Sequence, residues 1–250
     1  MAPPPRFRWR DRLPGRRPEA YFRWRGKEVS RLENLADGVF AFAVTLLVVA
    51  QQVPTTFEGL MEVIRSFPAF VASFVLLMFF WNVHYRFFRR FGFEDFFTRM
   101  VNYVILLLVI FSVYPLKFLF SAWLGGGKGV GTLDNLFLVY RIYGLGLAGI
   151  WGLFGVLYWH ALRQREELGL SPVEEILTRL DLWSAGINVA TCGLSIGLSF
   201  LPVHPWVPGL IYASLGLTLW FNGTRHGRQV EAELARQRNG RANGRASDRD

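Results

Sequence analysis

The sequence has long stretches that lack charge. Of its 250 residues, 52% are hydrophobic and only 19% are charged, and the charged residues are gathered in blocks separated by apolar runs. A soluble domain is about 45–50% apolar and scatters its charges along the chain. Apolar runs of about 20 residues are long enough to cross a bilayer as helices. The sequence therefore argues against a water-soluble domain and predicts a polytopic membrane protein.

Groups for covalent and metal chemistry are scarce. The one cysteine, Cys192, has no second cysteine with which to form a disulfide within the chain. No two histidines have the spacing of metal ligands, and neither a Ser/His/Asp arrangement nor a catalytic pair of carboxylates is visible. The chain is therefore expected to be no enzyme and to carry no cofactor and no metal. The histidines are His84, His160, His204 and His226.

Six apolar windows each have about the length that a membrane-spanning helix requires. The three prolines of PVHPWVP, residues 202–208, favour a tight turn between the last two windows. The predicted fold class is therefore all-α, a polytopic membrane protein with six transmembrane helices in residues 31–224. The windows are Leu35–Val53, Phe67–Val83, Met100–Leu124, Ile142–Leu162, Leu182–Leu201 and Trp206–Gly223.

Basic residues give the predicted orientation. An even number of helices places both termini on one side of the membrane, and that side carries most of the 28 Lys and Arg residues. Because cytoplasmic loops are enriched in Lys and Arg, the N- and C-termini are predicted to be cytoplasmic. Residues 1–30 are predicted to form a basic, disordered head without a cleavable signal peptide, and residues 225–250 a basic tail. Both are expected to attract anionic membrane lipids, and no nucleic acid is expected as a partner.

Polar residues inside the apolar windows meet at one predicted depth. Asp37 lies near the start of the first window, Trp81 and His84 lie in the last turns of the second, and Asn102 lies in the first turn of the third. A carboxylate beside indole, imidazole and amide groups can form a satisfied network. This network is predicted to join three helices, either as a fixed lock or as a moving part of a gate.

The first window also carries a stripe of side chains that points elsewhere. Phe42, Thr45, Leu46 and Val49 lie on one side of a helix. Asp37 points about 140° away from Phe42 at 100° per residue. Taken alone, such a stripe is more often part of a protein core than of a pore. The hydroxyl within it can bond the backbone carbonyl four residues back.

The same window resembles a known signature. The run RLENLADGVFAFAVTLLVV, which starts at Arg31, resembles the signature of the transmembrane protein 175 family, the endosomal and lysosomal potassium channels and their prokaryotic relatives. That signature reads R-x-x-x-F-S-D-G and continues into an apolar run with T-L-L. The later run FFWNVHYRFFRRFGFEDFFTRMVNYVILLLVIFSVYPL is similar to the family's second and third helices. Leu35 and Ala36 replace the signature's Phe and Ser, so one hydroxyl of the network is missing.

The resemblance implies a function and an assembly. It implies a potassium-permeable, leak-type cation channel of the prokaryotic single-repeat branch, which forms a homotetramer in the prokaryotic cell (plasma) membrane. It also implies K⁺ as the permeant ion. The pore is expected to be lined by the first helix, with Phe42, Leu46 and Val49 as the apolar constriction and Thr45 as an adjacent hydroxyl layer. Phe42 is larger than the usual Ile or Leu and is expected to narrow or close the pore.

The resemblance also assigns the polar residues. Arg31 and Asp37 correspond to the Arg and Asp of the signature, and both belong to the helix-locking network. Their partners in that network are Trp81, His84 and Asn102.

Other functions stay open. A proton path through Asp37 and His84 is an alternative, because histidine titrates near neutrality. A non-conducting membrane scaffold follows if Phe42 blocks the neck. A secondary transporter is a further alternative, although the two halves show no visible repeat and few charges lie at the membrane midplane.

Overall fold

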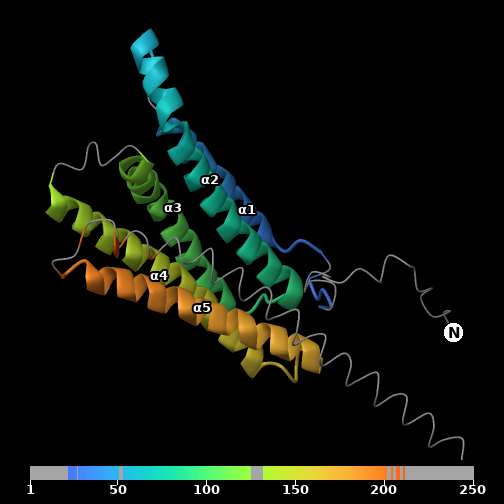
Figure 1. Ribbon diagram of the computed structural model, residues 1–250. Coiled ribbons are helices and arrows are strands. Elements are labelled where there is room, and N and C mark those ends of the chain that lie inside the picture. Colours follow the sequence, from blue (N-terminus) through green and yellow to red (C-terminus); the bar gives the residue numbers. More distant parts are fainter. Residues whose placement is uncertain are drawn as a thin grey trace, which may run out of the picture.

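The chain folds as a bundle of long helices (Figure 1). The computed structural model describes residues 22–26, 28–50, 53–124, 132–201, 204, 207–208 and 211. Within these residues it has five α-helices and no β-strand, which confirms the all-α prediction for this part of the chain. The predicted sixth window, Trp206–Gly223, lies almost wholly outside the described residues. The helices are α1 (Arg31–Val49), α2 (Phe57–Phe91), α3 (Phe96–Leu124), α4 (Leu133–Arg163) and α5 (Pro172–Leu198).

Four helices, α1 to α4, are long and apolar enough to cross a membrane. They contain the first four predicted windows except for the last residues of the first window. The fifth window falls on α5, which does not reach the same hydropathy within the described residues because polar side chains such as Ser184, Asn188 and Thr191 interrupt it. The membrane character of the chain is confirmed by α1 to α4.

Capping residues place the helix ends outside the apolar windows. Ser30 caps α1 and Ser171 caps α5, each in a capping box with the Glu three residues later. The C-terminal end of α2 is capped by Gly92. Its φ of 65° is a left-handed conformation that favours glycine, which has no side chain. A window defined by apolar residues misses such ends, because the capping turns are polar.

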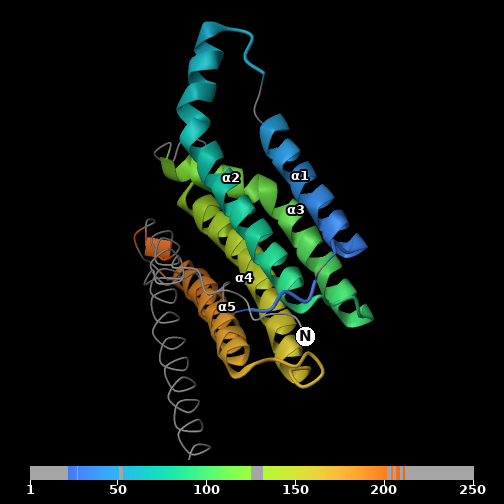
Figure 2. The ribbon, with the colours of Figure 1, turned by 90° about the vertical axis from the view of Figure 1, so that its right-hand side faces the viewer.

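Helix α2 is much longer than its predicted window. Its 35 residues give a length of about 52 Å at 1.5 Å per residue, against a hydrocarbon core of about 30 Å. Its first turns project beyond the neighbouring helices (Figure 2). The window excluded these turns because they contain Glu58, Glu62 and Arg65.

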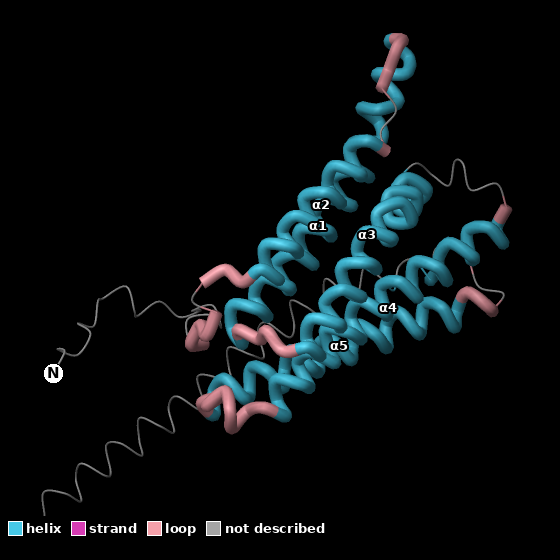
Figure 3. Tube along the Cα trace, turned by 180° about the vertical axis from the view of Figure 1, so that it is seen from behind, coloured by secondary structure: helices cyan, strands magenta, loops and turns pink. Residues whose placement is uncertain are grey.

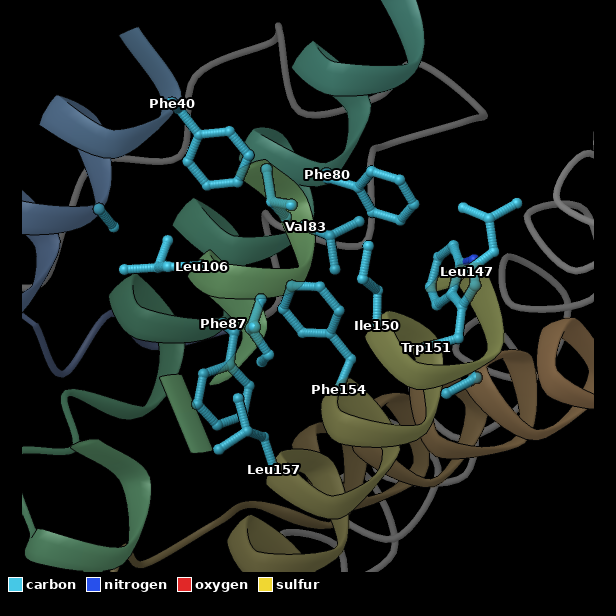
Figure 4. Packing of buried hydrophobic residues seen from close by; sticks show 14 of the residues in the cluster. Phe40, Phe80, Val83, Phe87, Leu106, Leu147, Ile150, Trp151, Phe154 and Leu157 are labelled. Atoms are coloured by element: carbon cyan, nitrogen blue, oxygen red, sulfur yellow. The ribbon is translucent and has the colours of Figure 1, made fainter. Parts of the chain in front are cut away.

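The helices pack in a simple order. Helix α3 contacts α1, α2 and α4, and α5 lies along α4 (Figure 3). Large side chains from four helices meet in the interior, among them Phe40 of α1, Phe87 of α2, Leu106 of α3 and Phe154 of α4 (Figure 4). Inside a bilayer such packing stabilises by close van der Waals contact, because lipid tails are as apolar as the side chains.

Residues 22–26, which we call the strap, run across one end of the bundle. This end is called the basic end here, because Arg86, Arg89 and Arg90 of α2 lie there. The Phe22 side chain is buried, with its ring edge-on to Phe91 at 5.4 Å between centroids. The prediction of a disordered head therefore does not hold for the strap, because aromatic packing and long-range hydrogen bonds fix it to the bundle.

Candidate pore helix and its polar anchors

Helix α1 has one buried face and one exposed face. The buried residues recur every three or four positions, as on a helix that packs along one side: Leu32, Glu33, Ala36, Phe40, Ala43 and Leu47. This face contacts α2 and α3. The chain therefore holds α1 by one side only.

The predicted stripe lies on the other side of α1. Phe42 is 54% exposed and Val49 is 69% exposed, Thr45 is exposed, and Leu46 is partly buried. Phe42, Thr45 and Val49 lie outside the interior of the subunit, whereas Leu46 packs partly against the core. Exposed bulky apolar side chains in a row require a partner, which can be lipid or other protein chains.

Thr45 places an oxygen in this stripe. Its hydroxyl donates a hydrogen bond to the carbonyl oxygen of Ala41 at 3.0 Å. This bond uses the hydroxyl proton and leaves a lone pair of Oγ1 free to accept or to coordinate a cation. The geometry therefore presents an oxygen acceptor toward whatever the stripe faces.

Asp37 fastens α1 to α2. Its Oδ1 accepts a hydrogen bond from the indole Nε1 of Trp81 at 2.8 Å. The Trp81 ring stacks on Tyr85 with 5.6 Å between centroids, and Tyr85 meets Trp24 of the strap edge-on at 6.3 Å. The carboxylate is itself exposed, so aromatic neighbours rather than burial hold this pair in place.

His84 and Asn102 form a second pair that fastens α2 to α3. The Nε2 of His84 lies 2.7 Å from the Oδ1 of Asn102, and both side chains are buried. The Phe40 ring of α1 lies 6.0 Å from the imidazole. The Nδ2 of Asn102 is buried with no hydrogen-bond partner among the described residues.

The predicted network is thus two separate pairs. Trp81 of α2 bonds Asp37 of α1, whereas His84 of α2 bonds Asn102 of α3. No hydrogen bond within the described part of the chain joins Asp37 to His84.

Arg31 is not brought into the network. It is exposed at the first position of α1, and no hydrogen bond or ion pair joins it to the network residues in the described ranges. Its place beside the anchors is taken by Arg89 of α2, whose Nε lies 3.7 Å from Oε1 of Glu33. This is an ion pair, too long for a hydrogen bond. The sequence offered one signal for Glu33, because S-R-L-E before an apolar run is a capping box.

Known proteins resemble this chain over most of its length. A potassium channel of Marivirga tractuosa is 33% identical over 199 residues, which cover 74% of this chain and 79% of that channel. The family model described as "Endosomal/lysosomal potassium channel TMEM175" matches residues 31–115, from the first residue of α1 into α3. The chain belongs to the TMEM175 family.

Solved TMEM175 structures share the helical arrangement. A variant of the potassium channel MtTMEM175, in complex with a nanobody–MBP fusion, matches with a TM-score of 0.70 at 29% identity, covering 84% of this chain and 97% of that one. A Chamaesiphon minutus homologue of the lysosomal potassium-selective channel TMEM175 matches with a TM-score of 0.56 at 23% identity over 78% of this chain and 96% of that one. At that identity the second match supports the fold alone.

The TMEM175 match coincides with the candidate site. Residues 31–115 contain the whole exposed stripe and both polar pairs, whereas the strap and α5 lie outside it. A potassium channel of Chamaesiphon minutus likewise matches only part of the chain, with 33% identity over 96 residues, or 35% of this chain and 47% of that channel. The sequence resemblance to the family is thus confirmed.

Proposed function

We propose that this chain is a potassium-permeable, leak-type cation channel, in which four copies surround a pore lined by α1. Support comes from the family and from its relatives in bacteria, which are described as potassium channels. The observation that carries the proposal is the division of α1 into two faces. The inner face is packed against α2 and α3, whereas Phe42, Thr45 and Val49 of the stripe are exposed and Leu46 lies at its partly buried edge.

The stripe has the chemistry of a narrow apolar neck. Four copies of Phe42, Leu46 and Val49 around an axis leave a passage that water fills only when it is wide enough, so the neck gates by wetting and dewetting. Such a neck discriminates only weakly between cations, because no ring of carbonyl groups replaces the water shell of the ion. The Oγ1 of Thr45 is the candidate oxygen ring in the stripe, and we assign it whatever preference for potassium the channel has.

The proposal extends to the membrane and the orientation. The basic end of the bundle gathers the start of α1, the end of α2 and the start of α3, and four arginines lie there in the segment Arg86–Arg99. By the positive-inside rule this end faces the cytoplasm of a prokaryotic cell, next to anionic lipid headgroups.

Potassium flux into liposomes tests the pore. Phe42→Ala removes the bulkiest ring of the proposed neck and is expected to raise K⁺ flux about tenfold, which corresponds to about 1.4 kcal/mol less barrier. The matched control is Phe111→Ala, because Phe111 is a phenylalanine of α3 that is 62% exposed and not on α1. Flux should be unchanged in the control.

Two results would contradict a pore that four copies of α1 line. One is equal flux in wild type, Phe42→Ala and Phe111→Ala, which would place the permeation path elsewhere. The other is a chemical cross-linking ladder of the purified protein that stops before four subunits. Absence of any flux from a folded tetramer would favour a non-conducting scaffold.

A further inference from the structure

The strap is tied to α5 by one buried carboxylate. The Oε1 of Glu174 accepts hydrogen bonds from the backbone N–H of Arg23 at 2.7 Å and from Nη1 of Arg25 at 3.1 Å. Its Oε2 accepts from Nη2 of Arg25 at 3.0 Å and from the backbone N–H of Ser171 at 2.8 Å. Glu174 is only 3% exposed. A buried carboxylate with four donors, two of them from one guanidinium, is a strong and directional link.

Arg25 makes this link specific. Beyond its fork to Glu174, its Nε donates to the carbonyl oxygen of Leu168 at 2.9 Å, and its Nη2 donates to that of Gly169 at 3.2 Å. Five donors in a fixed plane match this set of acceptors, and a lysine could not reproduce it. The Arg25 side chain is thus bound to the turn between α4 and α5.

The next residue of the strap is tied to α2. The N–H of Gly26 donates to the carbonyl oxygen of Arg89 at 3.2 Å, and Nη1 of Arg89 donates to the carbonyl oxygen of Gly26 at 2.9 Å. A Cβ at position 26 would lie 2.9 Å from the carbonyl oxygen of Phe88, which is backbone and cannot easily move. Only glycine permits this approach.

From α2 the connection continues into α1. Arg89 pairs with Glu33, and Glu33 accepts a hydrogen bond at 2.9 Å from the backbone N–H of Ser30, the residue that caps α1. Ser30 is only four residues after Gly26, a span of at most about 14 Å of extended chain. The start of α1 is therefore joined to α5 through the strap, both along the chain and through side chains.

We propose that Arg25 and Glu174 are positioning residues for the pore: through the strap they fix the basic end of α1 against α2 and α5 and hold the proposed neck narrow. This inference rests on the proposed function, because it requires α1 to line the pore. It concerns residues that lie outside the family match of residues 31–115.

The expected direction follows from the attachments. The strap joins α1 to helices of its own subunit, so releasing it leaves the start of α1 held by fewer contacts. When α1 moves more freely, its stripe packs less tightly against the stripes of the other three subunits. The dewetted neck of the proposed pore then opens more often. Substitutions along a coupling network change equilibria by roughly two- to thirtyfold, so the effect is measurable.

The main experiment compares Glu174→Gln with Glu175→Gln in liposome flux. Glu174→Gln removes the charge that holds Arg25 and is expected to raise K⁺ flux about threefold or more. Glu175→Gln makes the same change one residue later. It disturbs only surface pairs with Arg165 and Arg179 that do not touch the strap, so it should leave flux unchanged.

Two further readouts separate positioning from a general loss of structure. The K⁺/Na⁺ permeability ratio should stay at the wild-type value in Glu174→Gln, because the side chains of the stripe are unaltered. Trypsin should cleave after Arg25 in Glu174→Gln but not in wild type or Glu175→Gln, because the docked strap protects that bond. A second variant, Gly26→Ala, keeps both charges but displaces the strap from α2, and should raise flux in the same way.

The outcomes are distinct. If wild type conducts and Phe42→Ala raises its flux, but Glu174→Gln and Gly26→Ala conduct like wild type or less, the positioning role is refuted and the proposed function stands. If cleavage after Arg25 is equally fast in wild type, the strap is not docked and the inference fails. If neither wild type nor Phe42→Ala conducts, the proposed function fails and this inference with it.

Discussion

The buried pair of His84 and Asn102 offers a test of how α2 and α3 are joined. The two side chains share one hydrogen bond of 2.7 Å, and Nδ2 of Asn102 already has no partner among the described residues. Changing either residue alone to leucine removes the bond and leaves the remaining polar atoms buried and unpaired. Such an unpaired buried group costs about 1–3 kcal/mol. Replacing both partners by apolar side chains of similar size removes the bond and the penalty together and is nearly neutral.

The magnitudes can be read as shifts of the melting temperature. A loss of 1 kcal/mol lowers Tm by about 2–4 °C in a protein of 150–250 residues. His84→Leu and Asn102→Leu are each expected to lower Tm by about 4–8 °C, taking a loss of about 2 kcal/mol. The double variant should come back to within about 3 °C of wild type, because measured hydrogen bonds between membrane helices contribute only about 0.6 kcal/mol on average. Thermal unfolding of the purified protein in detergent, followed by size-exclusion chromatography, measures all four.

The same variants distinguish a fixed lock from a moving part. If the pair only locks α2 to α3, the double variant should conduct potassium like wild type, and this is the result we expect. A double variant whose Tm loss equals the sum of the two single losses would refute the reasoning, because the two residues would then act independently. A stable double variant with altered flux would instead assign the pair to gating.

Two other predictions concern the stripe and the strap. Thr45→Ala should lower the K⁺/Na⁺ permeability ratio by about threefold, equivalent to about 0.65 kcal/mol. Thr191→Ala, which removes a hydroxyl with the same bond to the carbonyl four residues back, should not lower it. For Glu174, burial acts to raise the pKa, but hydrogen bonds from Arg25 and from backbone N–H groups outweigh it and hold the pKa below its usual value. Stability from this lowered pKa is fully present above about pH 4.3 and is lost as the pH falls through the folded-state pKa. Tm should therefore fall more steeply below about pH 4.3 in wild type than in Glu174→Gln, and equal slopes would show that Glu174 is not the group responsible.

The sequence predicted the helices better than their contacts. Apolar windows predict which segments become α1 to α5, because the membrane demands long apolar helices. The turns of α2 that precede Phe67 were missed. They contain charged residues, which are compatible with a helix but not with an apolar window. The sequence placed Asp37 and Trp81 at the same depth in the membrane. This prediction depends only on the helical rise of 1.5 Å per residue. The contact of Arg25 with Glu174 could not be foreseen, since the residues are 149 positions apart and no periodicity links them.

The anchors of α1 are distributed unevenly along it, and this affects how the proposed neck can move. The cap at Ser30, the ion pair of Glu33 and the bond of Asp37 all lie in the first two turns, whereas the stripe begins at Phe42. Beyond Asp37 the inner face of α1 is held by apolar contacts, among them those of Ala43 and Leu47, so we expect the helix to tilt about its polar-anchored end. Val49 lies about 18 Å beyond Asp37 and Phe42 about 7.5 Å, so a tilt of about 5° displaces Val49 by about 1.6 Å and Phe42 by about 0.7 Å. A pivoting α1 therefore changes the width of the neck more at Val49 than at Phe42. In the proposed pore we therefore expect Phe42 to set the resting diameter and motion of the far end of α1 to open or close the path.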